Sequence, residues 1–190
     1  MTVKWIVSRV AVLLFLACLL AVLGGSPAGA VAARTAPEDH YFIVMSAADT
    51  HDASPGDGFC ADSLGNCTLR AAVEESNALP GDDTIDLQAL TYNITLGTMA
   101  VNSNIAIEGD FTPVTILDGT GNGGEAFSVS TGRLELSSMT IRDFTYSGAI
   151  ENIAGTVVAD NCACSNNMNI SVGLMQGGAI YNQGGTVTIS

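Results

Sequence analysis

The chain has few basic residues. Its 190 residues include 6 Lys and Arg against 19 Asp and Glu, which gives a formal net charge of −13. Such a chain repels polyanions, so the composition argues against nucleic-acid binding. Charged residues make up only 13% and hydrophobic residues 47%, a balance that excludes a disordered tail and favours a single globular domain.

The chain also lacks an apolar run that is long enough to span a bilayer. Residues 10–23 form an apolar run of 14 residues, whereas a transmembrane helix needs about 20. The run follows Lys4 and Arg9 and precedes a small-residue pattern at residues 28–32. We therefore interpret residues 1–32 as a secretory signal peptide and expect no transmembrane segment after its removal. An uncleaved membrane anchor is the alternative.

Removal of the leader leaves no lysine. The remaining basic residues are Arg34, Arg70, Arg133 and Arg142, so a mechanism that uses a lysine Schiff base has no candidate residue. Export also implies an oxidising compartment, in which cysteines pair. We expect a secreted or cell-surface protein.

Residues 33–86 are interpreted as an amino-terminal capping region. Residues 41–45 read as a first strand, and residues 49–66 are rich in Asp, Gly and Ser, which favour turns. The segment 68–78 is the one convincing helix, because Thr68 can cap it and its apolar residues follow helical spacing. Its expected buried face consists of Leu69, Ala72, Val73 and Ser76.

Short β-rich segments fill residues 87–190. They are separated by Gly, Asn, Asp and Ser, and the expected strands are 94–96, 105–107, 114–117, 127–129, 134–136, 139–141, 156–159 and 186–189. Residues 148–157 match residues 178–187 at seven of ten positions. Looser matches at offsets of 22 and 23 align Ile105 with Phe127, Ile116 with Met139, Leu136 with Ala159, and Met139 and Ile141 with Cys162 and Cys164.

This repeat length predicts an all-β fold, a right-handed parallel β-helix whose amino-terminal end is covered by the single α-helix. Asn152 and Asn182 share one repeat position, where stacked side-chain amides can form a ladder. A β-sandwich of antiparallel hairpins is the alternative.

Two groups of motifs carry a family resemblance. Residues 57–60, 67–73 and 75–78 resemble the CSLREA-type motif, although Ala71 and Thr68 stand where that motif has Glu and Ser. Residues 177–182 and 185–190 resemble coils of right-handed parallel β-helix proteins and are similar to repeats of polymorphic outer-membrane proteins. The resemblance implies a surface or secreted protein, associated with the outer membrane, of which this chain is a truncated member.

The cysteines suggest a disulfide. Cys60 and Cys67 close a short loop, so we expect them to form a disulfide. A zinc site that adds His40 or His51 is the alternative. Cys162 and Cys164 lie on one face of a strand, where we expect two small apolar residues of the core.

Acidic residues suggest two further sites. Asp49, Asp52, Asp57 and Asp62 crowd one loop. Solvated turn residues are the favoured interpretation, and a calcium site formed by these four carboxylates is the alternative. Many parallel β-helices cut acidic polysaccharides. A polysaccharide lyase or glycoside hydrolase of the pectin-acting type would draw on the following candidates: Asp118, Asp143, Asp160 and Arg142.

We assign no catalytic residue, because these acids stand in ordinary turn contexts. The expected function is a structural or adhesive module that contacts cell-surface glycans, or the surface of a host or neighbouring cell, through exposed Thr, Ser and Asn and through Tyr146 and Tyr181. The strand 186–189 has no residue that would blunt its edge, so we also expect self-association through that end.

Overall fold

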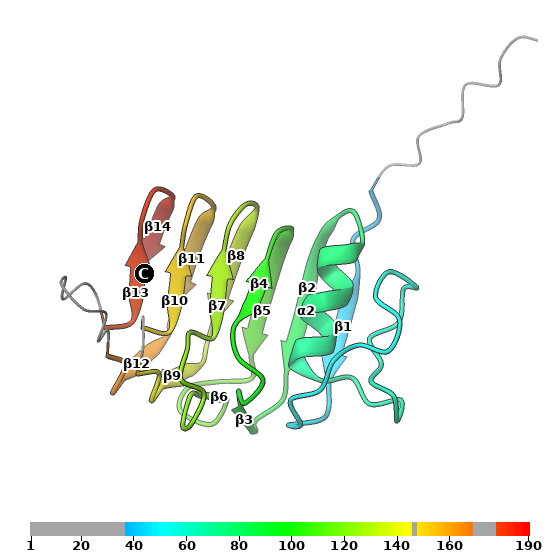
Figure 1. Ribbon diagram of the computed structural model, residues 1–190, viewed down its shortest axis with the longest axis horizontal. Coiled ribbons are helices and arrows are strands. Elements are labelled where there is room, and N and C mark those ends of the chain that lie inside the picture. Colours follow the sequence, from blue (N-terminus) through cyan, green and yellow to red (C-terminus); the bar gives the residue numbers. More distant parts are fainter. Residues whose placement is uncertain (1–36, 146–147, 169–177) are drawn as a thin grey trace, which may run out of the picture. The chain divides into compact units, whose positions relative to one another are not determined.

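The computed structural model describes residues 37–145, 148–168 and 178–190; the interpreted signal peptide and Tyr146 lie outside them. These residues form one α-helix and a series of short strands (Figure 1). The elements are β1 (Tyr41–Val44), α2 (Leu69–Ala78), β2 (Asp82–Leu87), β3 (Thr91–Asn93), β4 (Met99–Val101), β5 (Asn104–Gly109), β6 (Ile116–Asp118), β7 (Phe127–Val129), β8 (Arg133–Ser137), β9 (Thr140–Arg142), β10 (Ile150–Asn152), β11 (Thr156–Asp160), β12 (Ala163–Ser165), β13 (Ile180–Asn182) and β14 (Thr186–Ile189).

The strands form three parallel sheets. One sheet has the order β1-β2-β5-β8-β11-β14, the second β13-β10-β7-β4, and the third β12-β9-β6-β3. Every paired strand runs parallel to its neighbour, and the chain winds through the sheets in a right-handed sense (Figure 1). The parallel β-helix prediction is confirmed, and the antiparallel sandwich is wrong.

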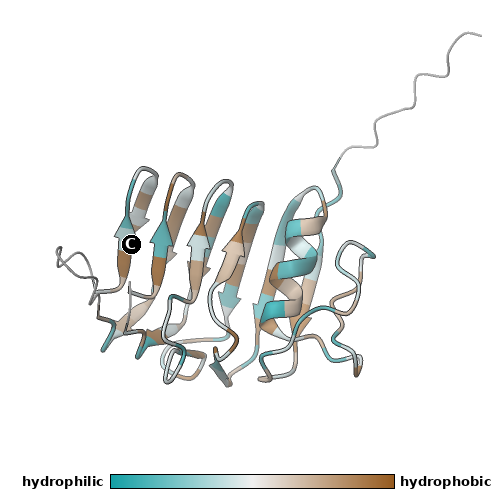
Figure 2. Cartoon of the chain, in the orientation of Figure 1, coloured by the Kyte–Doolittle hydropathy of each residue, from teal (hydrophilic) through white to brown (hydrophobic). Residues whose placement is uncertain are grey.

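The core consists of inward-facing side chains stacked in rows from turn to turn. In the six-stranded sheet one row runs through Ile85, Ile107, Leu136, Ala159 and Ile189. Because strand residues alternate between two faces, every second residue is buried and the others are more exposed. The hydropathy accordingly changes in bands along the strands (Figure 2). The first four side chains of this row are buried, whereas that of Ile189 is 72% exposed.

The register explains which repeat alignments hold. Leu136 pairs with Ala159 and Ile141 with Cys164, as expected. The match of Ile105 with Phe127 is wrong, because Ile105 pairs with Leu134 in another sheet. Turn length is variable, since the bends absorb insertions, so a constant offset misassigns such positions.

Another alignment misses by one residue. Ile116 pairs with Thr140, so Leu117 rather than Ile116 lies beside Ile141 in the core. The expected strand 94–96 is also shifted, since β3 ends at Asn93. The sequence patterns did not indicate β2, which pairs with β5 along its whole length.

The bends between strands use left-handed backbone at fixed positions. Ser138 and Asn161 follow β8 and β11, and Asp143 and Asn166 follow β9 and β12; all four have φ between 49° and 62°. Asn and Asp tolerate this conformation better than most residues. Asp143 therefore stands where the bend needs it.

The asparagine ladder forms as expected. The Nδ2 of Asn152 donates to Oδ1 of Asn182 at 2.9 Å and to the Thr186 carbonyl at 3.2 Å. Each Asn also donates to the carbonyl three residues later, Asn152 to that of Gly155 and Asn182 to that of Gly185. Gly185 must lack a side chain, because a Cβ there would lie 2.4 Å from Nδ2 of Asn152.

Helix α2 covers the amino-terminal end of the core. Its buried residues include the whole expected face, Leu69, Ala72, Val73 and Ser76, and it contacts β1, β2, β4 and β5. Thr68 caps the helix by accepting a hydrogen bond from the Ala71 N–H. Figure 1 shows α2 beside β4, in front of β2, where it stands in for a strand of the second sheet.

Candidate functional site

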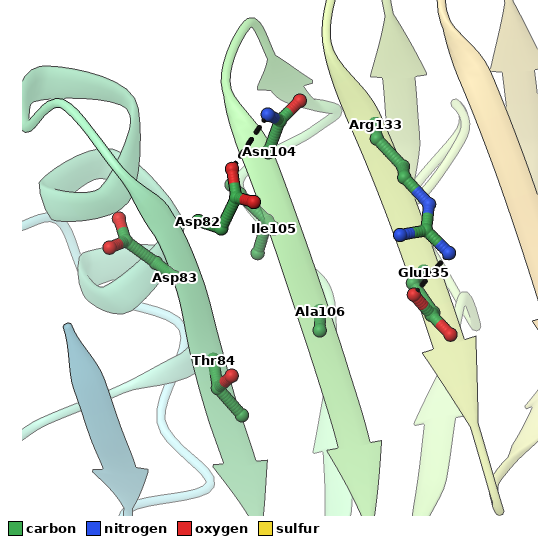
Figure 3. A pocket seen from close by; sticks show the side chains of 8 residues that line it. All are labelled: Asp82, Asp83, Thr84, Asn104, Ile105, Ala106, Arg133 and Glu135. Atoms are coloured by element: carbon green, nitrogen blue, oxygen red, sulfur yellow. Dashed lines mark hydrogen bonds and ion pairs between the residues drawn. The ribbon is translucent and has the colours of Figure 1, made fainter. Parts of the chain in front are cut away.

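A polar hollow lies on the outer face of the six-stranded sheet (Figure 3). It has a volume of about 120 Å³ and is lined by three strands, β2, β5 and β8. Parallel strands lie about 4.8 Å apart, so the hollow spans about 10 Å across the sheet. The lining residues are Asp82, Asp83, Thr84, Asn104, Ile105, Ala106, Arg133 and Glu135.

The small side chain of Ala106 leaves room in the middle of this hollow, between its row neighbours Thr84 and Glu135. On one side Asn104 Nδ2 donates to Asp82 at 2.8 Å. On the other side the Arg133 guanidinium pairs with Glu135 at 2.6 Å. The floor therefore offers carboxylate, amide, hydroxyl and guanidinium groups within one short surface, which suits the hydroxyl groups of a sugar.

Asp83 turns the other way, toward α2 (Figure 3). It occupies the core row of Ile105 and Leu134, and its Oδ1 accepts hydrogen bonds from the His40 main-chain N–H at 2.9 Å and from His40 Nδ1 at 3.2 Å. The sequence patterns did not single out this buried acid. Its inward position follows only from the register of β2, which places an acid in a row where the neighbouring turns have Ile105 and Leu134.

The structure brings together three of the four catalytic candidates. Arg142 donates through Nε and a terminal nitrogen to Oδ2 of Asp118 at 2.9 and 2.8 Å, and Nε lies 3.4 Å from Asp143. Asp160 belongs to a different sheet and accepts a hydrogen bond from the Ser190 hydroxyl. The guanidinium stays protonated in proteins, so Arg142 is a cation that pairs with the two carboxylates and does not accept a proton.

The ionisation of Asp118 fits a structural role. Burial alone would raise its pKa, but hydrogen bonds from Thr120 and from Arg142 outweigh burial, and the pKa of Asp118 lies below its ordinary value. The carboxylate is therefore ionised at neutral pH and cannot donate a proton as a general acid would.

The four candidate calcium ligands already accept hydrogen bonds from the protein. Asp49 binds Arg70 and the Thr95 and Leu96 N–H groups. Asp52 accepts from Ser54 and Ala61 N–H groups, Asp57 from that of Phe59, and Asp62 from Thr50, Leu64 and Asn66. Within the described ranges no group of three His, Cys, Asp or Glu could hold a metal ion. Calcium binding stays a prediction.

Helix α2 fastens the same loop from the other side. The carboxylate of Glu75 is buried and accepts from the Gly56 and Gly58 N–H groups. Glu74 accepts from the Asp52 N–H at 2.8 Å and pairs with His51. The motif-like residues of the helix thus bind the preceding loop.

The Cys60–Cys67 disulfide is confirmed, which rules out zinc bound by these two thiolates. Cys162 and Cys164 are free. Cys162 packs against the core, but Cys164 is exposed, which corrects the expectation for that residue. Its partner Ile141 on β9 is buried. Among the described residues β12 is the outermost strand of its sheet, so no described strand covers Cys164 on its other side.

The remaining expectations concern Tyr181 and membrane-spanning segments. Tyr181 lies on β13 and is half-buried. In the part of the chain that the structure describes, no helix has the length and apolar character needed to cross a membrane. No protein-family model, no curated protein and no solved structure matches this chain.

Proposed function

We propose that this chain is an exported, non-catalytic surface module that contacts cell-surface glycans through the hollow around Ala106. The observation that carries the proposal is the lining of that hollow, in which Asp82, Asn104, Arg133 and Glu135 present polar groups on a fixed sheet. Sheet positions are rigid compared with loops. Sugar hydroxyls can replace water on such groups without a large ordering cost.

Export is part of the proposal. The disulfide supports an oxidising compartment, and residues 1–32 have the pattern of a cleaved leader. Because residues 57–60, 67–73 and 75–78 resemble the CSLREA-type motif, we assign residues 57–78 to that type of sequence. Their proposed role is to close the amino-terminal end of a β-helix at the cell surface or outer membrane.

A glycan array with the full chain tests the proposal, followed by titration of the oligosaccharides that bind. Ala106→Tyr fills the hollow and is expected to weaken glycan binding at least about tenfold, because the larger side chain occupies the space that the sugar would take. Val158→Tyr is the matched control, because Val158 also faces outward in the same row, two strands away. Equal loss in both variants, or no bound glycan, would contradict the proposal.

The pectin-acting enzyme remains the second reading of the same fold. Release of unsaturated products from polygalacturonate in the presence of calcium, lost in Asp143→Asn or Asp160→Asn, would favour it over a binding module. The observed pairing of Arg142 with Asp118 leads us to expect no such release.

A further inference from the structure

The amino-terminal edge of the six-stranded sheet is open. Within the described residues β1 is the outermost strand and has a neighbour, β2, on one side only. The His40 carbonyl accepts from the Thr84 N–H on that side. Main-chain groups alternate along a strand, so those of Tyr41 and Ile43 face the side without a strand.

A groove runs along this open edge. It has a volume of about 440 Å³ and lies between β1 and the loop closed by the disulfide. Its lining includes Tyr41 and Ile43 on the strand side and Phe59, Ala61 and Gly65 on the loop side. The disulfide and the hydrogen bonds from Gly56 and Gly58 to Glu75 hold the loop wall in place.

The walls of this groove expose apolar side chains. Phe59 is 72% exposed, Tyr41 60% and Ile43 48%. Large apolar groups gathered beside free main-chain donors and acceptors are the features of a surface that accepts an added β-strand.

The surroundings are acidic. Residues 37–69 contain six Asp and Glu but no Lys or Arg. Three of these acids, Asp49, Asp52 and Asp62, are held by contacts within the cap. Glu38, Asp39 and Asp57 are exposed, and Asp39 and Asp57 each accept a main-chain hydrogen bond.

We propose that this groove takes an extended peptide segment of a partner protein, alternating basic and apolar side chains, as an added strand on β1. The main chain of the peptide pairs with Tyr41 and Ile43. Its apolar side chains contact Phe59 and Tyr41, and its basic side chains face the exposed acids. The site is separate from the hollow around Ala106, so each can fail without the other.

A fluorescein-labelled octapeptide of alternating Lys and Val tests the proposal by fluorescence anisotropy on the full chain. Saturable binding is expected. Ile43→Pro removes one outward N–H at an edge position that tolerates proline and is expected to weaken binding about tenfold, the equivalent of one main-chain hydrogen bond. Val187→Pro is the matched control on β14, the other edge of the same sheet.

Phe59→Ser gives a second measurement that leaves β1 unchanged, and it should also weaken binding. Thermal unfolding checks that each variant is folded. Four results would overturn the proposal: no saturable binding, equal binding of the Glu-Val counterpart, equal loss in Val187→Pro, or a gain in affinity on deleting residues 1–36, which would make the chain's own segment the occupant. Self-association of the chain that Ile43→Pro abolishes would instead assign the groove to a second copy.

Discussion

The two ends of the β-helix solve the same problem differently. At the amino-terminal end, Phe42 and Val44 are buried beneath α2 and its loop. In the last described turn, Ile189 lies in the same row as Phe42 and is exposed, and the inward side chain of Val187 is half-buried. Turn geometry is the same at both ends, since β14 pairs with β11 in the register of the earlier turns. An inward side chain is therefore buried only when another element covers it.

The covering element is held by charge as much as by apolar contact. Arg70 of α2 reaches Asp49, Glu74 reaches His51 and Glu75 reaches the loop. A helix at the end of a solenoid cannot form the main-chain hydrogen bonds by which one strand pairs with the next. The contacts of Arg70, Glu74 and Glu75 attach α2 to its loop instead. The following predictions test how far this end differs from the last turn.

Arg70→Ala should have the largest effect. The side chains of Arg70 and Asp49 are each 4% exposed, so the change leaves a buried carboxylate without its partner and should lower the free energy of unfolding by about 3–5 kcal/mol. Urea unfolding measures this. The control is Arg133→Ala, which breaks the exposed pair with Glu135 and should cost at most about 1 kcal/mol. Similar losses would show that burial does not matter.

One core row allows a direct comparison of turns. Leu136→Ala removes a buried side chain and should cost about 2–5 kcal/mol, because it leaves a cavity. Ile189→Ala in the same row should cost about 0.5 kcal/mol or less, because the side chain is exposed. Calorimetric or urea unfolding measures the loss of stability in each variant. An equal loss in the two variants would mean that self-association covers the last turn in solution.

Loss of the disulfide should weaken the amino-terminal end. The double change Cys60→Ser with Cys67→Ser opens a loop of seven residues' separation and should cost roughly 2–3 kcal/mol by loop entropy. Cys164→Ser, at the exposed free thiol of the last turns, should change stability by less than about 0.5 kcal/mol. The rate of limited proteolysis within residues 53–66 should rise in the double variant and stay unchanged in Cys164→Ser.

The asparagine ladder gives a smaller contrast. Asn152→Ala should cost about 1–3 kcal/mol, because Asn152 is fully buried and the change removes its hydrogen bonds to the Gly155 and Thr186 carbonyls and to Asn182. Asn182 is exposed, so water replaces its hydrogen bonds and Asn182→Ala should cost only a few tenths of a kcal/mol. Comparable costs would show that the ladder acts as one unit.

Acid should loosen the cap gradually. Burial alone would raise the pKa of Asp49, but the hydrogen bonds from Arg70, Leu96 and Thr95 lower it below its ordinary value. A depressed pKa in the folded state gives stability that is complete above the unfolded value of about 3.9 and disappears as pH falls through the folded pKa. Urea midpoints between pH 6 and pH 2 should show this slope, and Arg70→Ala should flatten it.

The sequence predicts this architecture well for a physical reason. Stacked turns repeat the same demands, so the match of residues 148–157 with 178–187 reports real pairing of Asn152 with Asn182. The capping helix was also predictable, because Thr68 and the spacing of apolar residues are local signals. The choice between Ile116 and Leu117 was not predictable, since both side chains are aliphatic and only the bend before them decides which one enters the core.

The sites were harder to predict because their partners come from distant segments. Asp49 looks like a calcium ligand in sequence, but its partners, Arg70 and the N–H groups of residues 95–96, are brought to it by the fold. The hollow has no motif at all. It exists because Ala106 is smaller than its neighbours in the row, a contrast that only the register reveals.

The turns have unequal lengths but keep one register, so the number of turns sets the length of the β-helix. Neighbouring strands of the long sheet are offset by 22, 29, 23 and 30 residues, yet each step pairs in parallel. Each further turn would therefore lengthen the rod by about 4.8 Å whatever the size of its loops. Duplication of one such segment in a gene would lengthen the β-helix in uniform steps, while the loops remain free to diverge.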